Sequence, residues 1–175
     1  MKRWTAGLFC AVAAAAASTA AQEPTLEYRV KATYLLNFTR FVEWPAPARP
    51  GAPLVICVAR LNPFATFLPT TLAGEQAAGR PLVSQVVTAP DPSCGVLFIP
   101  NGVAADPLLR AIGNAPVLTV GESPDFLERG GIIAFVLDAG RVRFAINPAA
   151  AERHQLLISS RLLQLALRTQ DGGGG

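Results

Sequence analysis

The chain has 175 residues, of which 51% are hydrophobic and 15% are charged, and its formal net charge is +3. This length and composition suit one domain with a hydrophobic core and exclude an intrinsically disordered chain. Lys2 and Arg3 carry two of the positive charges, and the rest of the chain has 13 basic residues against 12 acidic ones. That balance leaves no basic stripe of the kind that nucleic-acid-binding proteins use.

Residues 1–21 have the features of a secretory signal peptide. They begin with two basic residues, continue with an apolar stretch at 8–17 that is too short to span a membrane, and end in small residues before a cleavage site predicted at Gln22. Cys10 lies within this segment and would be removed with it. We therefore expect an exported protein, with an uncleaved N-terminal anchor as the alternative.

Two cysteines, Cys57 and Cys94, remain in the mature chain. Export would place them in an oxidising compartment, where disulfides form and persist. Each cysteine lies in an apolar strand pattern, so a bridge is feasible if the two strands are neighbours. We expect this disulfide, and two buried free thiols are the alternative. A metal site is disfavoured because two cysteines and one histidine are a poor ligand set.

The first predicted element is a helix from about residue 26 to residue 44. It contains most of KATYLLNFTRFVEWP (31–45), the densest run of aromatic and aliphatic residues in the chain. Pro45 disfavours the helical conformation at Trp44, so the helix should end there and leave the indole at its end. Large apolar residues recur every three or four positions, which predicts a helix packed on a sheet or a partner: Leu26, Val30, Tyr34, Phe38, Phe41 and Val42.

Four strands are predicted in the middle of the chain. The continuous apolar runs LVICVA (54–59) and CGVLFI (94–99) indicate strands that are buried on both faces. The run PLVSQVVT (81–88) is more polar and indicates a strand nearer an edge of the sheet. A further strand is predicted at 116–120, where the sequence is PVLTV.

Two short helices are predicted between these strands. Asn62-Pro63 and Asp106-Pro107 each combine a favoured N-cap residue with proline at the first helical position. The helix after Asn62-Pro63 should turn three apolar side chains toward the sheet: Phe64, Phe67 and Leu68.

A hairpin and a long helix are predicted at the C-terminal end. Gly130-Gly131 introduces a strand at 132–137, and RVRFAIN (141–147) alternates polar and apolar residues as an edge strand does. These two strands are therefore predicted to form an antiparallel hairpin at the edge of the sheet. From residue 148 to about residue 167, the apolar spacing predicts one continuous helix.

The order of these elements predicts an α/β fold. Strands that alternate with helices indicate a single three-layer sandwich domain with a mostly parallel central sheet, a C-terminal edge hairpin, and flanking N- and C-terminal helices. This domain should occupy residues 22–168, and a disordered glycine-rich tail is predicted at 169–175.

No arrangement of residues in the sequence indicates catalysis. The chain has no G-x-S-x-G motif, no dinucleotide-binding fingerprint and no P-loop. Its only histidine, His154, lies between Arg153 and Gln155 and is expected on the solvated face of the last helix. We therefore expect no catalytic residue, no cofactor and no metal, and we predict a protein that acts by contact. A hydrolase that uses His154 is the enzymatic alternative.

Two sets of side chains are candidates for contact with a partner. Phe41, Glu43 and Trp44 lie at the end of the first predicted helix, and Arg141 and Arg143 lie on the hairpin face opposite to its apolar residues. Exposed aromatic and arginine side chains are enriched at the energetic centres of interfaces. The alternatives are packing of the indole on the chain's own core and edge-strand charges that prevent aggregation.

Several stretches also carry a family resemblance. They are KATYLLNFTRFVEWP, the cysteine ahead of LFI, and the C-terminal pieces LTVGE, GGIIAF, RVRFAIN and LLISSRLLQLA, which together span about residues 26–167. With these motifs the chain resembles the YfiR-like family of periplasmic regulators. The resemblance implies a generally dimeric inhibitor that binds the periplasmic part of an inner-membrane diguanylate cyclase. It also implies control of cyclic di-GMP signalling and biofilm formation, with an OmpA-like outer-membrane lipoprotein as a second partner.

A second hypothesis is a periplasmic small-molecule-binding accessory protein for a sensor kinase or another membrane receptor. Doubly wound sheets bind ligands beyond the carboxyl ends of their strands. In this chain that region would include Arg60, Asn101 and Gly121-Glu122.

Overall fold

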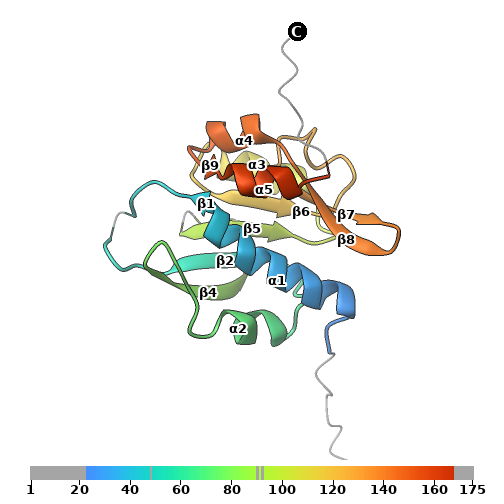
Figure 1. Ribbon diagram of the computed structural model, residues 1–175, viewed down its shortest axis with the longest axis horizontal. Coiled ribbons are helices and arrows are strands. Elements are labelled where there is room, and N and C mark those ends of the chain that lie inside the picture. Colours follow the sequence, from blue (N-terminus) through green and yellow to red (C-terminus); the bar gives the residue numbers. More distant parts are fainter. Residues whose placement is uncertain (1–22, 48, 90, 92, 168–175) are drawn as a thin grey trace, which may run out of the picture.

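A seven-stranded sheet forms the centre of the domain (Figure 1). The computed structural model describes residues 23–167 except 48, 90 and 92, so the predicted signal peptide and glycine-rich tail lie outside the described residues. The described residues form the main-sheet strands β2 (Leu54–Ala59), β3 (Gln76–Ala77), β4 (Arg80–Val87), β5 (Cys94–Ile99), β6 (Leu118–Gly121), β7 (Ile133–Asp138) and β8 (Arg141–Ile146). Two further strands, β1 (Val42–Glu43) and β9 (Leu157–Ile158), lie outside this sheet. The helices are α1 (Leu26–Phe41), α2 (Phe67–Leu72), α3 (Ala105–Ile112), α4 (Pro148–Arg153) and α5 (Ser160–Leu165).

The sheet is mostly parallel, which confirms the predicted fold class. Its strand order is β3-β4-β2-β5-β6-β7-β8; the five strands from β4 to β7 run parallel, and β3 and β8 pair antiparallel at the two edges. All residues of β2 and β5 are buried, as expected for strands covered on both faces. The predicted edge hairpin is β7–β8. A separate two-stranded sheet pairs β1 with β9.

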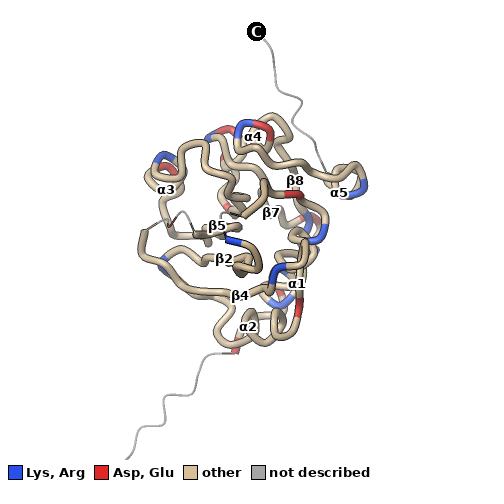
Figure 2. Tube along the Cα trace, turned by 90° about the vertical axis from the view of Figure 1, so that its left-hand side faces the viewer, with Lys and Arg blue, Asp and Glu red and all other residues tan. Residues whose placement is uncertain are grey.

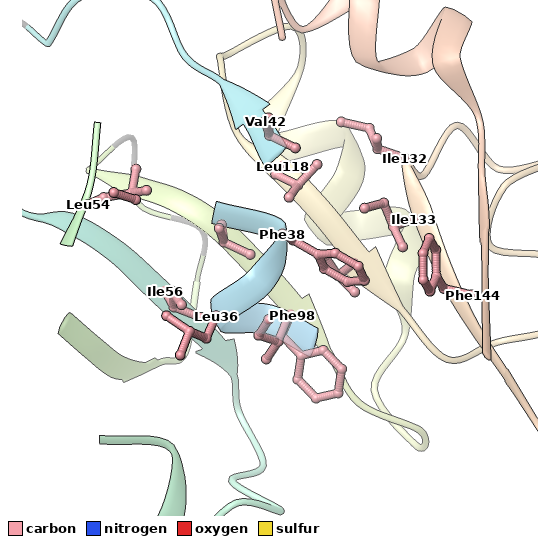
Figure 3. Packing of buried hydrophobic residues seen from close by; sticks show 14 of the residues in the cluster. Leu36, Phe38, Val42, Leu54, Ile56, Phe98, Leu118, Ile132, Ile133 and Phe144 are labelled. Atoms are coloured by element: carbon pink, nitrogen blue, oxygen red, sulfur yellow. The ribbon is translucent and has the colours of Figure 1, made fainter. Parts of the chain in front are cut away.

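An apolar core lies on each face of the sheet. On one face, α1 packs over the strands through side chains such as Leu36 and Phe38, which approach Ile56 and Phe144 (Figure 3). Residues of α4 and α5 belong to this same core. On the other face, α3 covers a smaller core that contains both cysteines. The helices therefore enclose the sheet as the outer layers of a sandwich.

The structure contains the predicted disulfide between Cys57 and Cys94. Cys57 lies in β2 and Cys94 begins β5, and these two strands are hydrogen-bonded neighbours. The Cα–Cα distance is 5.7 Å, which is an ordinary separation for a disulfide. The bridge thus joins the central strand β5 to its neighbour β2 across 37 positions of sequence.

The first helix differs from its prediction in length and in orientation. It ends at Phe41, and the next two residues form β1, where Val42 pairs with Ile158. Leu26 is 77% exposed, although it was placed on the buried stripe, whereas Lys31 is only 3% exposed. The prediction was wrong for Leu26, because it assigned the inward face by side-chain size and a lysine occupies part of that face, whereas Phe38 and Val42 of the same stripe are buried as expected.

The continuous C-terminal helix predicted at 148–167 is wrong. The chain instead forms α4, β9 and α5. Gln155 adopts φ 57°, a left-handed conformation that a right-handed helix cannot contain. Ser159 then starts α5, because its side-chain oxygen accepts a hydrogen bond from the N–H of Leu162.

The helix expected after Asn62-Pro63 begins later than predicted. The Asn62 side-chain oxygen accepts a hydrogen bond from the N–H of Phe64, but the chain continues as a turn in which Ala65 has φ 47°. The helix α2 starts only at Phe67. Phe64 and Leu68 are nevertheless buried in the core, as expected.

Candidate functional site

A buried ion-pair network joins α1 to the carboxyl ends of β5 and β6. Lys31 Nζ lies 2.5 Å from an oxygen of Glu122, and the two side chains are only 4% and 2% exposed. Lys31 also pairs with Glu27, one helical turn earlier. The other Glu122 oxygen accepts hydrogen bonds from the N–H of Asn101 at 2.6 Å and from the Tyr28 hydroxyl at 3.2 Å. The buried carboxylate therefore has a donor for each oxygen, which offsets the cost of its desolvation.

Two aromatic rings lie beside Lys31 in this network. Lys31 Nζ lies 4.7 Å from the ring centroid of Tyr28 and 5.7 Å from that of Phe135, within the range of cation–π attraction. Burial, together with the adjacent Glu122 carboxylate, raises the pKa of Tyr28 to about 12. The Tyr28 hydroxyl consequently remains a hydrogen-bond donor above pH 10, where an ordinary tyrosine loses its proton.

A cavity of about 390 Å³ opens beside this network. Its polar wall includes Glu27, Lys31, Asn101 and Glu122. A mostly apolar wall with a few polar groups is typical of small-molecule sites. The apolar residues are Pro124, Leu127, Ala134, Phe135, Val136, Leu137, Ala145 and Leu167.

The cavity includes only part of the ligand site predicted from the sequence. Asn101 and Glu122 line it, as expected for residues that follow parallel strands. Arg60 does not line it; its side chain is exposed after β2, and its N–H donates to the carbonyl of Val87. Gly121 also lies outside the lining. Sequence reasoning missed Lys31, and the available signal was a lysine within the apolar run of α1.

Trp44 lies at the opposite end of the sheet, next to the start of β5. Its indole N–H donates to the carbonyl of Gly95 at 3.0 Å, and the ring is partly buried against the main core. Phe41 is partly buried and Glu43 is exposed. A groove of about 550 Å³ runs beside the indole between proline and arginine side chains. Trp44 thus has both a packing role and an accessible surface.

The arginines of the second candidate surface are separated from Trp44. Arg141 and Arg143 are exposed on the edge strand β8. Figure 1 shows the β7–β8 hairpin at the end of the sheet away from β1, so the structure does not bring the two predicted sets together. Figure 2 shows basic and acidic residues close together on α1, α3 and α4, so these helices present charges of mixed sign.

His154 is buried, so its expected position on a solvated helix face is wrong. Only 6% of the residue is exposed, and its Nδ1 lies 2.7 Å from the carbonyl oxygen of Ala115. A carbonyl can only accept, so Nδ1 must carry the proton. The ring therefore ties α4 to the segment before β6. In residues 23–167, outside the three gaps, no three His, Cys, Asp or Glu side chains form a group that could hold a metal ion.

The chain matches a known protein family over most of its length. The sequence profile of the YfiR/HmsC-like family matches residues 28–167. No curated protein matches the chain. Within the described part of the chain, no helix has the length and hydrophobicity needed to cross a membrane.

Proposed function

Because this chain belongs to the YfiR/HmsC-like family, we propose that it is a periplasmic regulatory protein that binds and inhibits the periplasmic part of an inner-membrane diguanylate cyclase. Through that receptor it would control cyclic di-GMP signalling and biofilm formation. The observation that carries this proposal is the family match, which extends over residues 28–167. The disulfide supports an oxidising compartment such as the periplasm.

This function requires contact and no catalysis. A protein that binds one state of a receptor more tightly than the other shifts the receptor's population by that difference in affinity. Shifting a receptor from almost fully active to almost fully inactive takes a difference of about 10⁴-fold. The chain itself would neither synthesise nor bind cyclic di-GMP.

The proposed receptor contact is the surface formed by Phe41, Glu43 and Trp44. A partly buried indole beside a groove has the character of an interface anchor, because its position is fixed before binding. Arg141 and Arg143 are the second proposed contact. We also propose that the protein is a homodimer and that an OmpA-like outer-membrane lipoprotein competes for it with the cyclase.

Affinity capture tests the proposed receptor. Mature protein from Gln22 onward is immobilised and exposed to detergent extracts of its own organism's membranes, and bound proteins are identified by mass spectrometry. A diguanylate cyclase with a periplasmic domain is expected, and co-expression with this chain should lower cellular cyclic di-GMP. Recovery of a histidine kinase or a transporter in place of a cyclase would contradict the proposed target.

A small-molecule-binding accessory protein is the second candidate function. The specific observation in its favour is the cavity beside Lys31 and Glu122, because it combines a polar wall that contains these two buried charges with an apolar wall. Native mass spectrometry of protein purified under mild conditions should then show a retained small molecule that denaturation releases.

A further inference from the structure

We propose that the cavity beside Lys31 and Glu122 binds a small organic cation, in which an amine or guanidinium group is carried on an apolar body. This inference rests on the second candidate function above, and it adds the chemical class of the ligand. It is carried by the charges, the hydrogen-bond partners and the apolar wall of the cavity.

The charges that line the cavity favour a cation. One lysine and three carboxylates lie in the lining: Lys31, Glu27, Glu122 and Glu128. Lys31 already contacts both Glu27 and Glu122, so its positive charge is neutralised within the protein. An anionic ligand would therefore meet a net negative wall, whereas a cation would be attracted to it.

The three carboxylates have different roles. Glu122 is buried and receives hydrogen bonds from Lys31, Tyr28 and Asn101, so it is a fixed part of the wall. The Glu27 side chain is 36% exposed, and Glu128 is exposed. These two carboxylates are therefore the groups that can turn an oxygen toward a ligand.

A hydroxyl group adds a further polar contact. Ser123 lines the same cavity, and its hydroxyl oxygen is buried. The hydroxyl can donate its hydrogen to the nearby Asp125 carboxylate, which leaves its oxygen free to accept a hydrogen bond from a ligand. An N–H group of a bound amine would give this oxygen a donor.

The opposite wall suits the apolar body of such a ligand. Phe135 and Leu137 share one face of β7 and Val136 lies on the other. All three line the cavity, and Val136 and Leu137 remain 39% and 59% exposed. The volume of about 390 Å³ lies near the lower end of the range for ligand pockets. It therefore fits a molecule with one ring or one short aliphatic chain.

Three probes with the same ring and different charges test the proposal. They are 2-phenylethylamine, 2-phenylethanol and phenylacetate, each titrated calorimetrically into the folded mature protein. The amine is expected to bind at least about tenfold more tightly than phenylacetate. Glu128→Gln should weaken amine binding by about fivefold, the scale of one partly exposed ion pair, and should leave binding of the alcohol unchanged.

An exposed glutamate outside the cavity provides the control. Glu152→Gln on α4 changes the net charge equally and should leave amine binding unchanged. Equal binding of the three probes would overturn the cation class while the small-molecule function stands. Binding of none of them at millimolar concentration would overturn the cation site, and the receptor function would still be judged by membrane capture.

Discussion

Lys31 is the residue through which α1 is attached to the carboxyl ends of β5 and β6. Replacing it by methionine would leave the buried Glu122 carboxylate without its cation. We expect Lys31→Met to lower the free energy of unfolding by about 3–5 kcal/mol, the usual cost of removing one partner of a buried ion pair. Urea denaturation measures this loss.

The double variant Lys31→Met/Glu122→Gln is the matched control for this prediction. It removes both charges and keeps an oxygen that can accept from Tyr28 and Asn101. We expect it to be more stable than Lys31→Met alone, because no unpaired charge remains buried. The coupling between Lys31 and Glu122 would be contradicted if the double variant lost as much unfolding free energy as Lys31→Met and Glu122→Gln lose together.

Tyr28 makes the network sensitive to high pH. Its pKa is raised from 10.0 to about 12, first by burial and then by the Glu122 carboxylate, so folding favours the protonated hydroxyl. Its contribution to stability is full below pH 10 and is lost as the pH rises toward 12. Tyr28→Phe should therefore show a weaker decline of unfolding free energy over this window. If the unfolding free energy of Tyr28→Phe and of the unmodified protein declined equally, this pH dependence could not be assigned to Tyr28.

At the scale of the elements, the ring of Phe126 fits between two glycines. Phe126 is fully buried, and a Cβ added at Gly121 or Gly131 would lie 2.4 or 2.2 Å from the nearest ring atom. We expect Gly131→Ala to destabilise the protein by about 1–3 kcal/mol, as overpacking does. The same change in a Phe126→Leu background should cost less, because the narrower side chain leaves room for the methyl group. Thermal unfolding of the four proteins measures this difference, and equal costs in both backgrounds would contradict it.

Elements defined by local composition could be predicted from the sequence. The continuous apolar runs of β2 and β5 gave strands with the predicted bounds, because burial on both faces leaves a simple pattern. The C-terminal helix could not be predicted in this way. Its break at Gln155 depends on a left-handed backbone, and β9 depends on pairing with β1 over a hundred residues away.

The candidate site shows the same division between local and distant information. Asn101 and Glu122 were identified because residues after parallel strands meet at one edge of a sheet. Lys31 was missed because its burial depends on Glu122, 91 positions away in the sequence. The start of α5, by contrast, could have been predicted locally, because serine is a favoured N-cap residue and Ser159 caps this helix.

At the scale of the whole molecule, the disulfide constrains the central strand β5 and its neighbour β2. It spans 37 positions, for which the chain-entropy estimate is about 4 kcal/mol of stabilisation. We expect Cys57→Ala/Cys94→Ala to lose most of this amount in urea denaturation. Reducing agent should lower the unfolding free energy of the unmodified protein to a similar extent and leave that of the double variant unchanged. A double variant as stable as the oxidised protein would contradict this expectation.

The two ends of the sheet present different surfaces, and the receptor contact is assigned to the end that carries Trp44. Trp44→Ala removes one hydrogen bond to Gly95 and part of the packing, so we expect a stability loss of about 1–2 kcal/mol. If the indole is an interface anchor, receptor affinity should fall by at least about thirtyfold, which is about 2 kcal/mol. Affinity for the captured receptor and unfolding free energy are measured on the same preparation.

Trp44→Phe keeps an aromatic ring but lacks the N–H donor, and it separates anchoring by the ring from the hydrogen bond. It should retain more receptor affinity than Trp44→Ala, because most of the aromatic surface remains in place. A folded Trp44→Ala protein that binds the receptor with unchanged affinity would contradict the assignment, and so would a variant that fails to fold. In the first case Arg141 and Arg143 would remain as the proposed receptor contact, and Arg141→Glu and Arg143→Glu test it by the same affinity measurement.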